Sequence, residues 1–83
     1  MNISVLSPDK EFFTGEIDSV KVPGVSGEFE VLKNHAPIVS ALNAGAVTIK
    51  KKGGDTLVFK IKRGFIEVLS NQVSLLVQGI EES

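Results

Sequence analysis

The chain has 83 residues, of which 42% are apolar and 23% charged, a composition that suits one small globular domain and argues against disorder. It contains no cysteine, so a disulfide framework, a thiolate metal site and a cysteine nucleophile are excluded. Nine Lys and Arg nearly balance ten Asp and Glu, and the five Phe come without Tyr or Trp, so nothing indicates a nucleic-acid-binding surface.

The N-terminal segment lacks both the charged region and the apolar stretch of a signal peptide. The longest mostly apolar run, residues 36–42, is interrupted by Pro37 and Ser40 and is much shorter than the about 20 residues of a membrane-spanning helix. We therefore expect a chain that is not inserted in a membrane and reaches one only through a partner.

Apolar residues recur at every second position, a spacing typical of half-buried strands. In chain order, this alternation is found at residues 3–5, 46–50, 57–62 and 73–78. The run from residue 57 to residue 69 is nearly continuous but contains Arg63-Gly64. A glycine inside a strand predicts a bend, which we expect to carry the chain from one sheet to the other.

Turn-forming residues separate these segments. In chain order, the candidate turns are Pro23-Gly24 followed by Ser26-Gly27, then Ala44-Gly45, Gly53-Gly54 and residues 70–72. The adjacent glycines at 53 and 54 supply the positive φ angles of a tight hairpin. The only helical piece expected is a single turn near residues 34–36.

The turns follow one another at intervals of about 8–12 residues, which is typical of an all-β sandwich or barrel. We predict a two-layer antiparallel β-sandwich of about 8–10 short strands with at most one helical turn. A single domain covers residues 1–83, and no linker, repeat or low-complexity segment divides it.

Few residues are candidates for chemistry. His35 is the one histidine, and no Gly-x-Ser-x-Gly elbow accompanies it, so we interpret it as a loop histidine with a backbone or partner contact. The pairs Glu28/Glu30 and Glu81/Glu82 lack the spacing of a calcium loop. We expect no catalytic residue, no cofactor site and no metal site.

Two glycine-rich segments differ from phosphate-binding loops. Neither residues 24–27 nor residues 52–54 fit the Gly-x-x-x-x-Gly-Lys-Ser/Thr pattern, and neither leads into a helix that could hold an anion. We interpret both as strand turns and expect no nucleotide binding. The three lysines at 50–52 are interpreted as a solvated strand end that blocks edge pairing.

The most informative segment is residues 26–45. Residues 27–31 read Gly-Glu-Phe-Glu-Val, a short loop follows, residues 35–37 read His-Ala-Pro, two apolar residues come next, and Gly45 closes the motif. This order and spacing resemble the signature of the N-terminal β-sandwich domain of the epsilon subunit of bacterial F-type ATP synthases, called delta in mitochondria.

The resemblance extends to the flanks and covers nearly the whole chain. The matching pieces are residues 5–8 with 12–15, residues 20–24 and residues 63–68. Two local departures concern the loop before the histidine. Glu30 stands where the family often has glycine, and Lys33-Asn34 replaces the usual Pro-Gly.

The resemblance implies a non-catalytic central-stalk rotor subunit that couples the gamma subunit to the proton-translocating membrane ring. It also implies a peripheral position, through the complex, on the cytoplasmic side of the bacterial cell membrane. Family members commonly continue into a two-helix C-terminal domain, and we expect this chain to lack one because too few residues remain after Gly79. The residues expected at partner surfaces are Glu28, His35, Ala36, Pro37, Ile38, Val39 and Leu42.

Two alternative functions are left open. A lipoyl or biotinyl carrier domain presents a modified lysine on a hairpin, and Lys52-Gly53-Gly54 resembles such a tip. The typical neighbours of that lysine, Asp-Lys-Ala or Met-Lys-Met, do not occur here. A stand-alone ligand-binding sandwich is the second alternative, although a chain with Phe as its only aromatic residue is poorly suited to sugar stacking.

Overall fold

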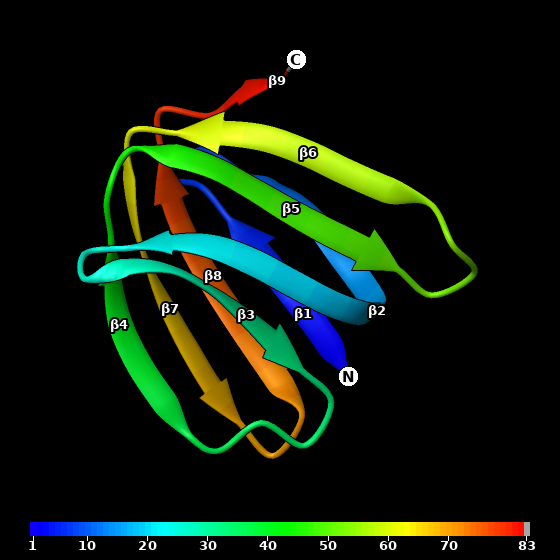
Figure 1. Ribbon diagram of the computed structural model, residues 1–83. Coiled ribbons are helices and arrows are strands. Elements are labelled where there is room, and N and C mark those ends of the chain that lie inside the picture. Colours follow the sequence, from blue (N-terminus) through cyan, green and yellow to red (C-terminus); the bar gives the residue numbers. More distant parts are fainter. Residues whose placement is uncertain (83) are drawn as a thin grey trace.

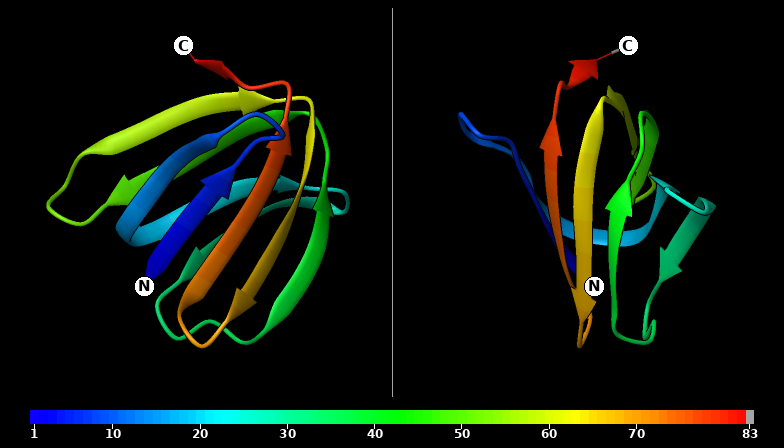
Figure 2. Two further views of the ribbon diagram at one scale, coloured as in Figure 1. Left: turned by 180° about the vertical axis from the view of Figure 1, so that it is seen from behind. Right: turned by 90° about the vertical axis from the view of Figure 1, so that its left-hand side faces the viewer.

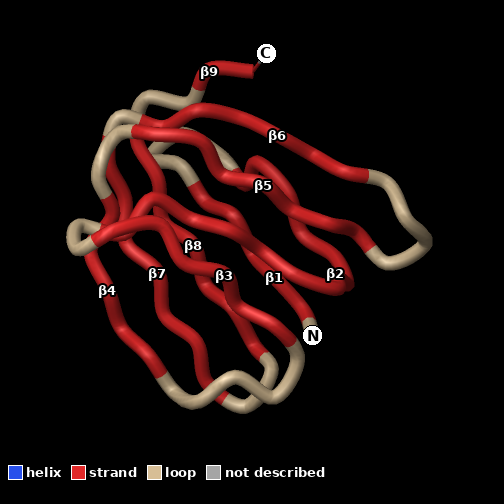
Figure 3. The backbone as a smooth tube through the Cα atoms, viewed as in Figure 1, coloured by secondary structure: helices blue, strands red, loops and turns tan. Residues whose placement is uncertain are grey.

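The computed structural model describes residues 1–82 as strands joined by turns and loops, with no helix among them (Figure 3). The prediction of an all-β fold is confirmed. The strands are β1 (Asn2–Leu6), β2 (Glu11–Gly24), β3 (Gly27–Leu32), β4 (Ile38–Leu42), β5 (Gly45–Lys51), β6 (Thr56–Ile61), β7 (Arg63–Leu69), β8 (Gln72–Gln78) and β9 (Glu81–Glu82).

The strands form two packed layers joined by β2. The first layer has the order β1-β8-β7-β4, and the second contains β3, β5, β6 and β9 with the later part of β2. The 14-residue β2 pairs with β1 through its beginning and with β3 and β5 through its later part. The second layer lies in front in Figure 1, and the view from behind in Figure 2 brings the first layer forward.

One pairing differs from the predicted antiparallel arrangement. β1 and β8 run parallel, with Asn2 beside Gln72 and Leu6 beside Leu76, whereas the other pairings found within residues 1–82 are antiparallel. Parallel strands need a long connection, and almost the entire chain connects these two. No local sequence pattern indicates that β1 and β8 pair in parallel.

Two predicted hairpin turns are confirmed. Gly53 and Gly54 have φ angles of 100° and 105° in the turn between β5 and β6. Ser70 and Asn71 also have positive φ, 49° and 62°, in the turn between β7 and β8. Asparagine tolerates this left-handed conformation better than most residues, so it is a natural turn residue.

The turn between β2 and β3 lies within the predicted segment, residues 23–27. Pro23 and Gly24 form the end of β2, and the turn itself consists of Val25 and Ser26. Gly24 serves packing instead, because a Cβ there would lie 2.8 Å from the ring of Phe29. The predicted turn is therefore confirmed, and its two turn residues are those in the middle of the segment.

The helical turn predicted near residues 34–36 is not formed. The backbone N–H of His35 donates a hydrogen bond to the carbonyl of Leu32 at 3.1 Å, and Asn34 has a φ of 65°. This is a β-turn with a positive φ at its third residue. A left-handed residue cannot continue a right-handed helix, so the turn ends there.

The predicted crossing between layers is confirmed, but glycine plays a different part in it. The chain leaves β6 after Ile61, bends at Lys62 and enters β7 at Arg63. Gly64 already lies inside β7, where a Cβ would approach the carbonyl oxygen of Leu76 to 2.7 Å. The missing side chain therefore allows β7 to lie close to β8.

The core is one apolar cluster between the layers, and its side chains come from alternate positions of the strands. Phe59 is fully buried, and its ring lies 4.8 Å from that of Phe12, measured between centroids, at a tilt of 57°. The buried apolar residues are Ile3, Val5, Ile17, Val20, Val22, Val31, Leu42, Val47, Ile49, Phe59, Ile61, Ile66, Val68, Val73, Leu75 and Val77.

Adjacent residues of β6 provide a test of this core. Phe59→Ala should lower the free energy of unfolding by about 3–5 kcal/mol, because it removes a buried ring and leaves a cavity. Val58→Ala, on the outer side of the same strand, should cost less than about 1 kcal/mol. Chemical denaturation followed by circular dichroism measures both. Similar losses for the two variants would contradict the assigned inner and outer sides.

Candidate functional site

The outer side of the first layer carries an apolar row across all four strands. Leu6 lies beside Leu76, Leu76 beside Phe65, and Phe65 beside Ala41 in the register of the sheet. The exposed fractions are 37% for Leu6, 50% for Leu76 and 43% for Phe65. Neighbouring cross-strand side chains touch, so these residues form continuous apolar surface, not scattered contacts.

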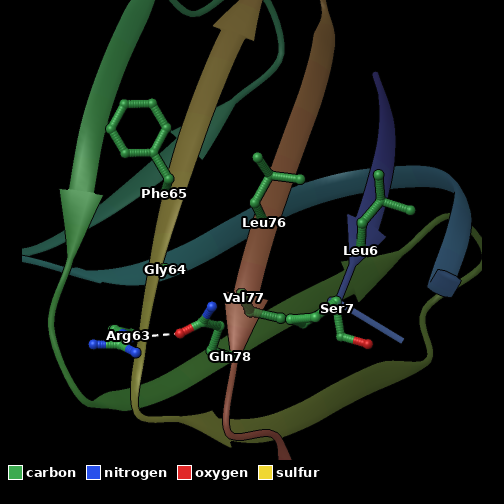
Figure 4. Close-up of a pocket in the computed structure, with 9 residues that line it drawn as sticks. Leu6, Ser7, Arg63, Gly64, Phe65, Leu76, Val77 and Gln78 are labelled. Atoms are coloured by element: carbon green, nitrogen blue, oxygen red, sulfur yellow. Dashed lines mark hydrogen bonds between the residues drawn. The ribbon is translucent and has the colours of Figure 1, made fainter. Parts of the chain in front are cut away.

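A groove of about 460 Å³ adjoins this row where β1, β8 and β7 lie together (Figure 4). Leu6, Phe65 and Leu76 form its apolar part. Arg63 and Gln78, which are paired across β7 and β8, line it as well. The groove thus combines an apolar wall with a cationic side chain.

A second, smaller hollow of about 230 Å³ lies on the same side of the layer at the start of β4. It is lined in part by Pro37, Val39, Glu67 and Leu69. Val39 and Leu69 are 59% and 58% exposed. Contiguous exposed apolar surface of this kind marks interaction sites. We call the row Leu6, Leu76, Phe65 and Ala41, together with Val39 and Leu69, the outer apolar face.

The outer side of the second layer is different in character. Lys21 lies between Glu30 of β3 and Thr48 of β5, and its Nζ is 4.0 Å from Glu28 Oε1. On β6, Lys60 lies beside Glu81 of β9. Alternating charges suit a surface that stays in water. The two sides of the sandwich are therefore chemically distinct.

A pair of amides ties the loop after β3 to the turn between β7 and β8. The backbone N–H of Asn34 donates to Asn71 Oδ1 at 2.7 Å, and Asn71 Nδ2 donates to Asn34 Oδ1 at 3.0 Å. The carbonyl of Asn71 also accepts a hydrogen bond from the backbone N–H of Asn2 at 3.0 Å. Three segments far apart in the sequence are thus joined beside the His-Ala-Pro loop.

His35 makes a backbone contact within this loop. Its Nδ1 lies 2.7 Å from the carbonyl oxygen of Ala36. A carbonyl oxygen only accepts, so Nδ1 carries the hydrogen and donates it. The ring is oriented by its own loop, in agreement with the interpretation of His35 as a loop histidine.

The predicted partner residues lie in different parts of the fold. Pro37, Ile38 and Val39 line the small hollow beside the outer apolar face. Leu42 is only 3% exposed and belongs to the core, so it is not available at the surface, and Ile38 is half-buried against the core. The physical reason is the strand period, since residues 38, 40 and 42 of β4 point inward. Glu28 is exposed on β3, in the second layer.

The sequence analysis did not identify most of the outer apolar face. Leu6, Phe65, Leu69 and Leu76 were missed as surface residues. A signal was nevertheless present, because residues 75–77 of β8 are apolar at three consecutive positions. Such a run indicates a strand with apolar residues on both sides. What the sequence could not show is that the outward residues of four strands line up.

The charged hairpin end between β5 and β6 lies apart from the outer apolar face. Lys52 Nζ is 3.1 Å from Glu16 Oε2, and both side chains are largely exposed. The hydrogen bond from Lys52, together with its positive charge, lowers the pKa of Glu16. Lys51 lies over the ring of Phe13, 4.9 Å from its centroid. These contacts give the three-lysine segment intramolecular partners.

Among residues 1–81, whose side chains the structure describes, no three or more His, Cys, Asp or Glu side chains are placed to hold a metal ion. Among the same residues there is also no helix with the length and apolar character needed to cross a membrane.

Comparisons with known proteins give a consistent result. The family model described as ATP synthase, Delta/Epsilon chain, beta-sandwich domain matches residues 1–83. The ATP synthase epsilon chain of Caulobacter vibrioides is 40% identical over 83 residues, which are all of this chain and 95% of that protein. The epsilon chain of Leptospira borgpetersenii is 46% identical over 76 residues, or 92% of this chain but only 59% of the relative.

Solved structures share the fold at lower identity. A chain of the Euglena gracilis mitochondrial ATP synthase, in a structure of OSCP, F1 and c-ring, superimposes with a TM-score of 0.89 at 21% identity, over 96% of this chain and 51% of that one. A chain from the central stalk and c-ring of the Tetrahymena thermophila enzyme gives 0.80 at 17% identity, over 99% and 66%. This chain therefore spans about half to two thirds of those two proteins.

The amide pair of Asn34 and Asn71 can be tested by substitution with glycine, which keeps the positive φ angle and removes only the side chain. Asn34→Gly, Asn71→Gly and the double variant form a cycle. We expect a coupling free energy of about 0.5–1.5 kcal/mol from the one hydrogen bond between the two side chains, since Asn34→Gly keeps the backbone N–H that donates to Asn71. Urea denaturation of the four proteins measures it. Strictly additive losses would show that the two side chains do not stabilise one another.

Proposed function

The chain belongs to the β-sandwich domain family of ATP synthase delta/epsilon chains, and from this we propose that it is a non-catalytic rotor-stalk subunit of a proton-translocating ATP synthase. In this role it lies between the gamma subunit of the central stalk and the membrane ring. The epsilon chains among its relatives, one of them covered over 95% of its length, support the proposal. No covalent chemistry is required of this chain.

The observation that carries the proposal furthest is the outer apolar face. A subunit held in a stalk needs one surface that leaves water on assembly, and burial gains roughly 25 cal/mol per Å² of apolar area. The first layer offers such a surface as a continuous row. The exposed apolar side chains Leu32 and Val58 of the second layer instead lie beside Ser19 and Thr48 and form no row. We therefore assign the outer apolar face to the gamma subunit.

Contacts with the ring are assigned to polar residues. Glu28 is exposed near the hairpin between β2 and β3, and His35 to Pro37 form an ordered loop. Polar side chains on turns suit contacts with polar loops, because neither partner needs a large apolar area. Through the ring, the chain would lie peripherally on the cytoplasmic side of the bacterial cell membrane.

The architecture supports transmission of torque. Backbone hydrogen bonds join neighbouring strands throughout both layers, and β2 takes part in each of them. A shear force on one layer is therefore passed to the other through one continuous strand. A rigid body of this kind can couple two partners without a conformational change of its own.

The two alternatives are less well supported. A carrier domain would need its lysine free at the hairpin tip, but Lys52 pairs with Glu16. A ligand-binding sandwich would need a polar, enclosed pocket, whereas the main groove is open and adjoins the apolar row.

The assignment of the face predicts a selective loss of binding. Leu69→Asp should leave the fold intact, because the side chain is 58% exposed, and should weaken binding of the gamma subunit by about tenfold or more through burial of an unpaired carboxylate. Val58→Asp, on the second layer, is the matched control. Size-exclusion chromatography and calorimetry of each variant with purified gamma measure the effect, and thermal melts report folding. Undiminished binding by the variant of the outer apolar face, or loss of binding by the control alone, would refute the assignment.

A further inference from the structure

Arg63 occupies an unusual place on the outer side of the first layer. It begins β7 in the same outward phase as Phe65, and it lines the groove beside the apolar row. Its Nε–H donates to Gln78 Oε1 at 2.5 Å, the contact drawn as a dashed line in Figure 4. No ion pair or further side-chain hydrogen bond of Arg63 is found among residues 1–81, whose side chains the structure describes.

The contact with Gln78 has a specific consequence for the guanidinium group. Arginine has five N–H donors in a planar fork, and Nε provides one of them. When Nε is held by a neighbour, the plane of the group is fixed and the two terminal nitrogens remain available. A donor group oriented in advance loses less conformational entropy on binding. The two terminal nitrogens of Arg63 are thus oriented to donate two hydrogen bonds to a planar anion.

The surroundings narrow the choice of anion. Arg63 stands beside exposed Phe65 and Leu76, and no second cationic side chain lines the groove. An anionic lipid surface or a polyphosphate would require several cations close together. One arginine next to an apolar groove fits a single carboxylate attached to an apolar segment.

We infer that this groove recognises an acidic side chain, Asp or Glu, of the gamma subunit, which binds the Arg63 fork while a neighbouring apolar side chain of gamma enters the groove against Phe65 and Leu76. The inference rests on the proposed function, because it takes gamma as the occupant of the outer apolar face. It adds a source of specificity, since charge pairing fixes the register of two otherwise apolar surfaces.

The test compares variants of Arg63 in complex with purified gamma. Arg63→Gln removes the charge and should weaken binding by about 10- to 100-fold. Arg63→Lys keeps the charge without the fork and should recover only part of this loss. Gln78→Ala keeps the charge of Arg63 but removes the hydrogen bond that orients its guanidinium group. We therefore expect the affinity for gamma to fall by about threefold. Lys60→Gln, on the second layer, is the control and should bind as the unmodified chain does.

Salt dependence and charge reversal separate this inference from the proposed function. Affinity for gamma should fall with rising NaCl for the unmodified chain and much less for Arg63→Gln. Arg63→Glu should regain binding with a gamma variant in which one acidic residue is changed to Lys. Unchanged affinity and salt dependence in Arg63→Gln, with Leu69→Asp still impaired, would overturn the carboxylate contact and keep the proposed function. Undiminished binding by both variants would overturn the carboxylate contact and the assignment of the outer apolar face to gamma, whereas failure of the unmodified chain to bind gamma would overturn the proposed function.

Discussion

The structure depends on the burial of one apolar side of each layer against the other. Alternate residues of nearly every strand supply this core, and β2 belongs to both layers, so neither can separate without losing strand pairing. The outward residues of the first layer are not needed for this purpose. Their apolar character therefore requires a second explanation, and a partner surface provides it.

The two outer sides show how one small sheet protein can serve two environments. On the second layer, Lys21 lies beside Glu30 and Lys60 beside Glu81. On the first layer, Leu6, Phe65 and Leu76 align. An apolar surface alone would bind in several registers. Charged and polar groups at the edge of the surface reduce the number of possible registers. We assign this role to Arg63.

Much of the fold could be predicted because its signals are local. Alternation in residues 57–62 and the Gly53-Gly54 pair define a strand and a turn without reference to the rest of the chain. The parallel pairing of β1 with β8 and the row across four strands are products of register between distant segments. Leu42 illustrates the same limit, since a family motif indicated its importance but only the strand phase placed it in the core.

Accessibility in the assembled complex tests the central claim most directly. The chain has no cysteine, so Leu76→Cys and Val58→Cys each introduce one thiol, on the first and second layers respectively. Both should react with an alkylating reagent in the free chain. After addition of gamma, the intact mass of this chain should show that the thiol at position 76 is protected while that at position 58 still reacts. Protection at position 58 with continued reaction at position 76 would contradict the account.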